Sequence, residues 1–289
     1  MTSPYAPLLL EWEEALGRRH EVADTLALWT VVLEGWARWP SGLVAPLPWS
    51  ALECRERWER GAPLITEAEP ELPREPIEEM VGPVMERIAE AAPDSASALQ
   101  RFAEAWDGGA VGPRDLLPAA GKEGAAAREE RLGLGGTLPG FLALAGLRPA
   151  LEAHFSACRE VPEGIWLPGV CPWCGGLPAY GDLVEDGRRR LSCHLCGGTW
   201  IAPRLRCPFC ENWESRDLVR LVGEGSEEGY FIEACRACHG YIKGVDRRQR
   251  WNAVSPLVED WVSPHLDLYA TREGYWRGTP SLVQLAPPE

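Results

Sequence analysis

The 289-residue chain carries ten cysteines and a formal net charge of −14, and 45% of its residues are hydrophobic. This composition is typical of a globular protein with about two domains, and the acidity argues against nucleic-acid binding as the main task, because phosphate contacts require a basic surface. No apolar run approaches the ~20 residues that span a bilayer and the first residues lack secretory-signal features, so we expect a cytoplasmic protein without a membrane span.

Residues 1–164 are predicted to form a bundle of five or six helices, because apolar residues recur there at helical spacing. Ser50 and Glu53 match the S-x-x-E capping pattern, which predicts a short helix beginning at that point. The clearest apolar stripes comprise Leu26, Trp29, Leu33 and Trp36; Ile77, Met80, Val81, Val84, Met85 and Ile88; Leu99, Phe102 and Trp106; Leu138, Phe141 and Leu142; and Leu147, Leu151, His154 and Phe155.

Charge and cysteine content both change near residue 165. Residues 1–164 hold 15 basic and 27 acidic side chains, a net charge of −12, whereas residues 165–250 hold 12 and 11, a net charge of +1. Eight of the ten cysteines lie between Cys171 and Cys238. Because the two signals are independent, we predict a domain boundary between residues 164 and 165.

The eight clustered cysteines form four CxxC pairs, with 18, 10 and 24 residues between successive pairs. Each tight turn presents two sulfurs at once, and two such turns complete a tetrahedron of thiolates around a metal ion. The spacing therefore predicts two four-cysteine metal sites. The predicted ligands are Cys171, Cys174, Cys193, Cys196, Cys207, Cys210, Cys235 and Cys238.

The cysteine region is an internal repeat, which we divide into one ribbon at residues 165–202 and a second at 203–252. Each unit contains a CP-aromatic-C knuckle, a strand, a glycine-bearing turn, a second strand and a further CxxC, which is typical of rubredoxin-like or zinc-ribbon modules. The predicted turns lie at Asp186–Gly187 and at residues 223–225. Hairpin connections favour closing each metal site within its own repeat, over an interleaved arrangement.

We expect two metal ions, one per four-cysteine site, and both iron and zinc accept four thiolates in tetrahedral geometry. A closed four-cysteine site leaves no position open for substrate, which favours a structural role; a redox role is the alternative. Modules this small bury too little apolar surface to fold unaided, so metal binding is expected to contribute to folding.

The residue after the second cysteine of a knuckle is expected to need a positive φ. Gly175 and Gly197 meet this need in the first repeat, whereas the second repeat has Glu211 and His239.

Several residues near the knuckles receive individual predictions. Trp173 and Phe209, each between two knuckle cysteines, are expected near the surface, and His194 and His239 are expected to face solvent rather than bind metal. Cys54 and Cys158 stand outside the knuckles and are interpreted as buried or incidental thiols, because a cytoplasmic setting disfavours disulfides.

Residues 253–289 form the last predicted segment. Leu257, Trp261, His265 and Leu268 have near-helical spacing, and Pro264 is expected to kink or split the closing helix. The predicted fold class is therefore α+β and mainly α: an N-terminal helical bundle, two tandem ribbons and a C-terminal helix.

Four ordered motifs within residues 165–278 resemble those of the formate dehydrogenase accessory protein family, FdhE. The motifs are CPWCGGLPAYG, LSCHLCGGTWIAPRLRCPFCE, CRACHGYIK and LDLYATREGYWRG. They include Tyr241, Lys243 and Asp267, outside the knuckles. The resemblance implies a cytoplasmic maturation factor for formate dehydrogenase, with a helical N-terminal part and two rubredoxin-like modules that bind iron or zinc through the eight cysteines.

The partner that this resemblance implies is the formate dehydrogenase catalytic subunit, which we expect to dock on the ribbon face and closing helix. Self-association into a homo-oligomer is left open. No GxSxG, Walker, HExxH or GxGxxG motif occurs, so we predict a protein that is not an enzyme, without catalytic residues. The alternatives are a zinc-ribbon nucleic-acid-binding or transcription-associated module, disfavoured by the charge, and a rubredoxin-like electron carrier.

Overall fold

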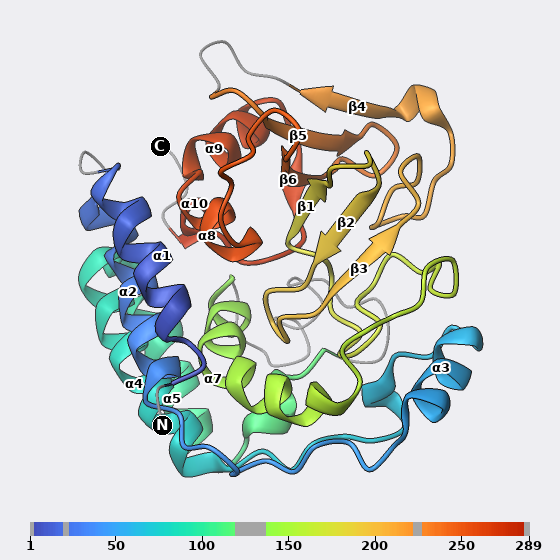
Figure 1. The fold of residues 1–289 in the computed structure, drawn as a ribbon. Coiled ribbons are helices and arrows are strands. Elements are labelled where there is room, and N and C mark those ends of the chain that lie inside the picture. The colour runs from blue at the N-terminus through green and yellow to red at the C-terminus, as the bar shows by residue number, and fades with distance from the viewer. Residues whose placement is uncertain (1–2, 20–22, 119–136, 222–226, 286–289) are drawn as a thin grey trace.

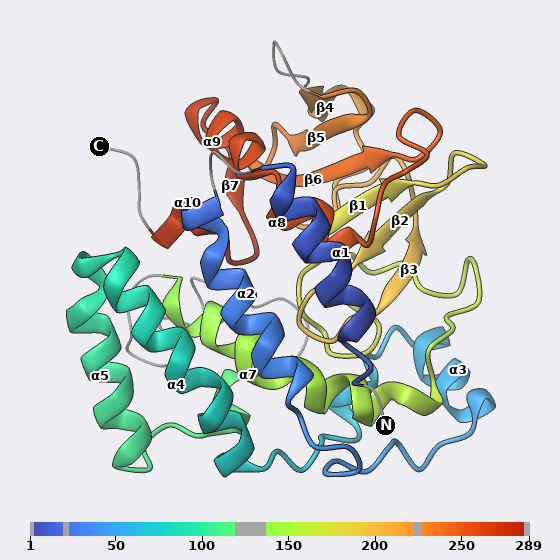
Figure 2. The ribbon, with the colours of Figure 1, turned by 60° about the vertical axis from the view of Figure 1, so that its left-hand side comes forward.

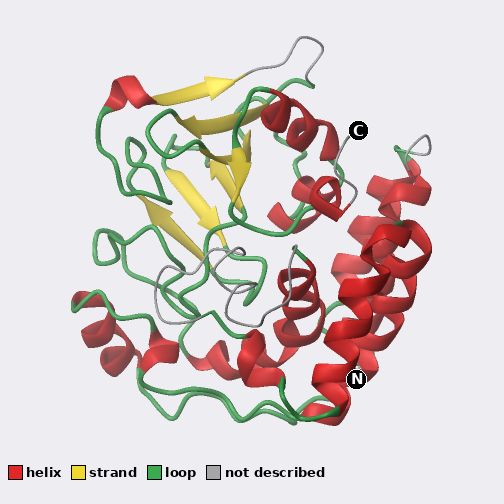
Figure 3. Ribbon diagram, turned by 180° about the vertical axis from the view of Figure 1, so that it is seen from behind, coloured by secondary structure: helices red, strands yellow, loops and turns green. Residues whose placement is uncertain are grey.

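The structure is a computed structural model that describes residues 3–19, 23–118, 137–221 and 227–285. Long helices occupy one side of the molecule and a mixed sheet the other (Figures 1 and 3). The predicted α+β class, with helix as the larger part, is confirmed. Within the described ranges, no helix combines the length and the apolar character that crossing a bilayer requires.

Most of the N-terminal helices pack side by side as a bundle (Figure 2). α2 lies between α1 and α4, and α4 packs against α7. The predicted stripes are the buried faces of these helices, as at Trp29, Val84 and Phe102. The bundle consists of α1 (Ala6–Gly17), α2 (Ala23–Ala37), α4 (Arg74–Ala91), α5 (Ala96–Asp107) and α7 (Leu138–His154).

Two details of the bundle differ from the prediction. The helix α1 was not predicted, although its Trp12 is fully buried. The stripes from Leu138 to His154 belong to one continuous helix, α7, which contains Pro149, and Phe155 follows in a 3-10 turn. Nearly every residue of α7 is buried, as expected for a helix within the core.

The short helix α3 (Ala51–Glu59) lies apart from the bundle, between two long connections (Figures 1 and 2). Its start matches the prediction: Ser50 and Glu53 form a capping box, in which the Ser50 N–H donates to the Glu53 carboxylate over 2.8 Å.

The two ribbons share one seven-stranded sheet with the order β3-β2-β1-β6-β5-β4, and β7 pairs with β6. The first ribbon contributes the hairpin β1–β2, which turns at Gly187, and the second contributes β4–β5. The second predicted turn, at residues 223–225, lies outside the described residues. The strands are β1 (Tyr180–Leu183), β2 (Arg189–Ser192), β3 (Thr199–Ala202), β4 (Leu218–Leu221), β5 (Tyr230–Cys235), β6 (Gly240–Asp246) and β7 (Trp276–Arg277).

The ribbons meet where β1 runs parallel to β6, with Gly181 opposite Gly244. A Cβ atom on Gly244 would lie 2.0 Å from the Gly181 carbonyl oxygen, so this close approach requires glycine. The domain boundaries at 164/165, 202/203 and 252/253 stay predictions, although the sheet itself runs across the middle one.

The closing segment forms two helices, α8 (Pro256–Trp261) and α9 (Pro264–Arg272), split at Pro264 as predicted. Both contact the sheet, and α8 also contacts α1 of the bundle. The chain then passes through β7 to the short helix α10 (Leu282–Leu285).

An aromatic cluster around Trp261 joins the closing segment to the bundle. The ring of Trp261 stacks on Trp29 with centroids 4.0 Å apart and lies 5.9 Å from the rings of both Trp12 and Trp36. Rings of this size bury a large apolar area and gain further from stacked and edge contacts. Helix α8 is therefore held against α1 and α2 by its last residue.

Gly146 of α7 provides a test of the bundle packing. A Cβ atom there would lie 2.8 Å from Val81 Cγ2 and 2.9 Å from Ile77 Cγ2 of α4. We expect Gly146→Ala to lower the free energy of unfolding by about 1–3 kcal/mol, because overpacking outweighs the ~1 kcal/mol that alanine gains in a helix. Gly82→Ala, with no atom within 4 Å of its Cβ, should instead be neutral or stabilising. Urea unfolding of both variants checks this, and a stabilised Gly146→Ala variant would contradict the packing.

Candidate metal centres

Each of the four CxxC pairs lies in a tight turn closed by a backbone hydrogen bond. In the first turn the Gly175 N–H donates to the Cys171 carbonyl over 2.9 Å, and the other three turns repeat this bond. The residue after the second cysteine has the predicted positive φ in every turn: 70° at Gly175, 71° at Gly197, 62° at Glu211 and 57° at His239. The second repeat therefore carries a conformational cost of about 1 kcal/mol per residue that glycine avoids.

Site one is the group of four sulfurs from the first ribbon. Its sulfurs lie within 4.8 Å of one another, with 3.4 Å between those of Cys171 and Cys196 and 3.5 Å between those of Cys174 and Cys193. All four cysteines are buried. A zinc–sulfur bond of about 2.3 Å places tetrahedral thiolates ~3.8 Å apart. The group needs to expand only slightly to fit such an ion.

Site two is the corresponding group of the second ribbon. Its sulfurs also lie within 4.8 Å of one another, with 3.7 Å between those of Cys207 and Cys238 and 3.8 Å between those of Cys210 and Cys235. In contrast to site one, Cys210 is exposed and Cys238 is half-buried. Site two therefore reaches the surface, whereas site one does not.

The structure brings together the two sets of cysteines that pairing within each repeat predicts, and not the interleaved sets. Either group could hold a metal ion. Coordination by these eight cysteines stays a prediction.

Hydrogen bonds among the thiols favour a thiolate within each group. The bond between Cys207 and Cys238 lowers the pKa of Cys207 to about 5, and bonds from Cys171, Cys174 and Cys196 hold the pKa of Cys193 well below its usual range. Metal ions bind thiolates rather than thiols. Burial instead raises the pKa of Cys171, Cys174 and Cys210, so each group contains one cysteine that favours the thiolate and others that favour the thiol.

The first knuckle is fixed against the helical half of the chain. The indole N–H of Trp58 donates to the Pro172 carbonyl over 3.0 Å. The backbone N–H groups of Leu64 and Ile65 donate to the carbonyls of Pro172 and Trp173 over 3.0 and 2.9 Å. The prediction that Trp173 lies near the surface is wrong: it is fully buried because the helical half covers the knuckle. In site two, Phe209 is half-buried, with its ring 5.4 Å from that of Trp276.

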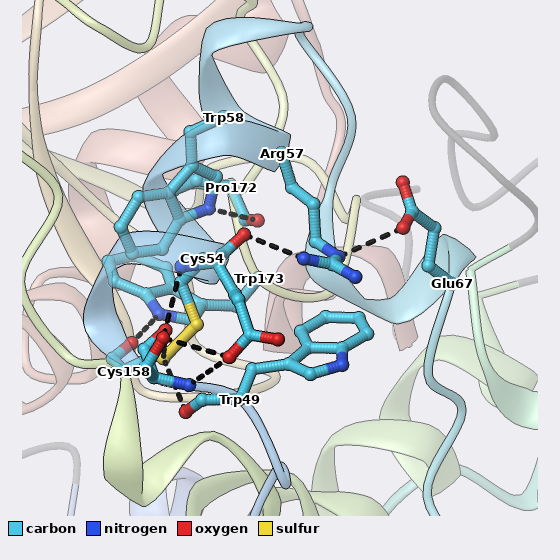
Figure 4. Close-up of a disulfide and its surroundings, with 10 residues drawn as sticks. Trp49, Cys54, Arg57, Trp58, Glu67, Cys158, Pro172 and Trp173 are labelled. Carbon is cyan, nitrogen blue, oxygen red and sulfur yellow. Dashed lines mark hydrogen bonds and ion pairs between the residues drawn. A yellow bond between two sulfur atoms is a disulfide. The ribbon is translucent and has the colours of Figure 1, made fainter.

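Cys54 of α3 and Cys158, which follows α7, form a disulfide behind the first knuckle (Figure 4). Both are buried, as predicted, but their interpretation as unpaired thiols is wrong. The indole of Trp173 donates to the Cys158 carbonyl and thereby connects the disulfide to site one. The two cysteines are 104 residues apart, so only the tertiary fold reveals their proximity.

The predictions for the two knuckle histidines differ in outcome. His239 is exposed, as expected, but His194 is buried, with Nδ1 3.4 Å from an Asp260 carboxylate oxygen. Burial lowers the pKa of His194 to about 3, although Asp260 opposes the shift. Neither histidine belongs to the sulfur groups, which consist of cysteines alone.

A buried ion network lies between the sheet and the closing helices. Lys243 of β6 donates to Asp267 over 2.7 Å and lies 3.0 Å from an oxygen of Asp260. Arg277 of β7 donates to both carboxylates over 2.6 Å. The hydroxyl of Tyr241 donates to Asp267 over 2.8 Å. Two cations thus balance two carboxylates, as buried charges require.

Four members of this network, Tyr241, Lys243, Asp267 and Arg277, occur in the motifs that resemble FdhE, whereas Asp260 lies outside them. The only sequence signal of Asp260 is a charge within a largely apolar segment. The cavity beside Lys243, Asp260 and Asp267 measures about 10 Å³. This is about the space that one water needs, so the network is a packed contact rather than a substrate pocket.

Known proteins resemble this chain in sequence and in fold, although no family model matches it. The FdhE homologue of Stutzerimonas stutzeri is 35% identical over 158 residues, 49% of this chain and 50% of that protein. The homologue of Aquifex aeolicus is 32% identical over 140 residues, 47% of this chain and 48% of that protein. The chain thus spans about half the length of the curated relatives it matches.

The crystal structure of the FdhE protein from Pseudomonas aeruginosa has a similar fold. It superimposes with a TM-score of 0.57 over 99% of this chain and 96% of that one, at 23% sequence identity. The likeness to FdhE proteins inferred from the motifs is therefore confirmed in sequence, and the fold likeness extends over both halves of the chain.

The difference in exposure predicts that the two sites lose metal at different rates. With a chelator in excess, we expect one metal ion per chain to leave site two rapidly and the second to leave only as the core opens. Metal release followed by absorption of the chelator complex checks this. Cys210→Ser should remove the rapid phase alone, and a single common rate for both ions in the unmodified protein would contradict the prediction.

Asp260→Asn tests the ion network. Arg277 and Lys243 outweigh the burial that by itself raises the pKa of Asp260, and they lower it to about 2. The carboxylate therefore stabilises the fold above pH ~4, and this contribution is lost as the pH falls toward 2. At pH 7 we expect the substitution to cost about 3–5 kcal/mol, because it leaves a buried cation unbalanced. Urea unfolding measures this cost. Glu273→Gln, at an exposed carboxylate, should change stability by less than about 0.5 kcal/mol.

Proposed function

We propose that this chain is an accessory protein for the maturation of a formate dehydrogenase and acts in the cytoplasm by binding the catalytic subunit, not as an enzyme. The observation that carries the proposal is the combination of the FdhE-like fold over 99% of the chain with two four-cysteine groups in the motifs that resemble FdhE. The match in sequence to FdhE homologues supports it independently.

In this proposal each four-cysteine group holds one metal ion, iron or zinc, through all of its thiolates. Iron in such a site exchanges one electron, whereas zinc has no redox chemistry and acts structurally. Site one, sealed between Trp58, Trp173 and Trp200, holds the first ribbon against the helical half. Its role is in folding.

Site two lies at the surface, where a partner protein can reach it. Cys210 is exposed, and Trp213 of the second ribbon and Trp276 of β7 are 58% and 43% exposed. Large aromatic side chains with partial exposure are enriched at protein interfaces. The catalytic subunit therefore docks at the second ribbon, within contact of site two.

The cytoplasmic location is compatible with the disulfide between Cys54 and Cys158. Disulfides are rare in reducing compartments, but reduction requires a thiolate to reach one of the sulfurs. These two cysteines are 0% and 4% exposed, so the fold shields the bond. The net charge of −14 supports a protein partner rather than a nucleic acid.

Capture of the catalytic subunit tests the proposal. The tagged, metal-loaded chain should retain a formate dehydrogenase catalytic subunit from a co-expressing extract, and Cys210→Ser should retain at least severalfold less, because it opens site two at the docking surface. Ser215→Ala, an exposed position of the same ribbon, should retain as much as the unmodified chain. Retention of no catalytic subunit, under reducing and oxidising conditions alike, would refute the proposal.

A further inference from the structure

A pocket of about 170 Å³ lies on the sheet face opposite α8 and α9. Tyr241 and Lys243 of β6 face the closing helices, so the strand register places Arg189 of β2, Arg220 of β4 and Glu233 of β5 on the opposite face, where they line the pocket. The connection from the first ribbon to the second covers it. The pocket therefore forms only because the two ribbons share a sheet.

The wall of the pocket is fixed by a buried arginine. Arg189 is 3% exposed and pairs with Glu233 over 2.7 Å, and it donates to the Arg206 carbonyl in the covering connection over 2.9 Å. Its Nε–H, however, has no hydrogen-bond partner among the described residues. A buried donor left without a partner costs ~1–3 kcal/mol.

Two further arginines, Arg204 and Arg220, line the pocket. Within the described part of the chain, no carboxylate lies within 4.0 Å of the guanidinium of Arg204 or Arg220. Arg220 instead lies over the Phe231 ring, 3.7 Å from its centroid, and Arg204 makes one long hydrogen bond, 3.4 Å, to the Gly187 carbonyl. Burial lowers the pKa of Arg220; Glu233 and Asp246 oppose this shift, and the like charges of Arg204 and Arg248 add to it. An anion between the two guanidinium groups would relieve this repulsion.

The rest of the pocket is apolar. Leu183, Leu218, Val219 and Phe209 contribute to its lining, and Leu205 at the same pocket is 58% exposed. A ligand that satisfies both parts carries an anion next to a hydrophobic group. An extended polyanion such as a nucleic acid instead requires a continuous basic track.

We propose that this pocket binds an acidic segment of a partner protein, with a carboxylate held between Arg204 and Arg220 and a neighbouring apolar side chain against Leu205 and Leu218. Guanidinium groups bind carboxylates with two parallel hydrogen bonds, which fixes the orientation of the segment. Cys207 and Cys235 also line the pocket, so the bound segment lies against site two. This inference rests on the proposed function, which supplies the partner.

A peptide titration tests the pocket directly. The probe is the acetylated and amidated tetrapeptide with alternating leucine and glutamate, titrated calorimetrically into the metal-loaded full chain; its counterpart with glutamine in place of glutamate is the matched ligand. We expect the glutamate peptide to bind at least about tenfold more tightly than the glutamine peptide, the effect of losing charge pairs in a partly desolvated site. Equal affinity for the two peptides, or tighter binding of a single-stranded oligonucleotide, would overturn the inference.

Substitutions that reverse or remove a positive charge of the pocket provide a second test. Arg204→Glu changes an exposed side chain that forms no ion pair with any described residue, so the fold should survive, and Arg220→Gln removes the second charge. Each substitution should weaken the binding of the glutamate peptide at least about tenfold. Arg216→Glu, 82% exposed and outside the pocket lining, should leave the affinity unchanged. Unchanged binding by Arg204→Glu and Arg220→Gln would overturn the inference.

Capture of the catalytic subunit by the same variants separates the two proposals. If the unmodified chain captures the subunit and Arg204→Glu captures it equally well, the pocket inference fails while the proposed function stands. If the unmodified chain captures no subunit, the proposed function fails, and the peptide titration alone decides whether the pocket binds acidic segments.

Discussion

The buried ion network around Asp260 and Asp267 is the interaction on which the arrangement of the two halves depends. Its cations come from the sheet, Lys243 on β6 and Arg277 on β7, and its carboxylates come from α8 and α9. Each of these four side chains would become an unpaired buried charge if it lost its partners, which is strongly unfavourable. The closing helices are therefore confined to one position on the sheet.

The neighbouring residue, Trp261, extends this constraint to the bundle. Successive residues of a helix point about 100° apart, so Asp260 reaches the sheet while Trp261 packs among the tryptophans of α1 and α2. A six-residue helix thereby connects the ribbons to the N-terminal half through the polar contacts of Asp260 and the aromatic contacts of Trp261. Site one shares this core, whereas site two lies outside it.

The two metal-site candidates illustrate how one sequence pattern acquires two environments. Their knuckles have the same spacing and the same backbone turn, but only the first lies under Trp58 and the segment that contains Leu64. The parallel pairing of β1 and β6 joins the two ribbons in one sheet, and the arginine-lined pocket beside site two is lined by residues of both ribbons. The fold thus separates a buried site suited to stability from an accessible one suited to contact with a partner.

The sequence by itself determined the features that depend on short spacings: the two cysteine sets, the positive φ after each knuckle, the capping box at Ser50 and the break at Pro264. These follow from local geometry, which a few neighbouring residues fix. Only the tertiary structure decided the features that join distant segments. The Cys54–Cys158 disulfide, the burial of Trp173 and His194, and the pairing of Asp260 with Arg277 arise because packing brings together residues that no local pattern relates.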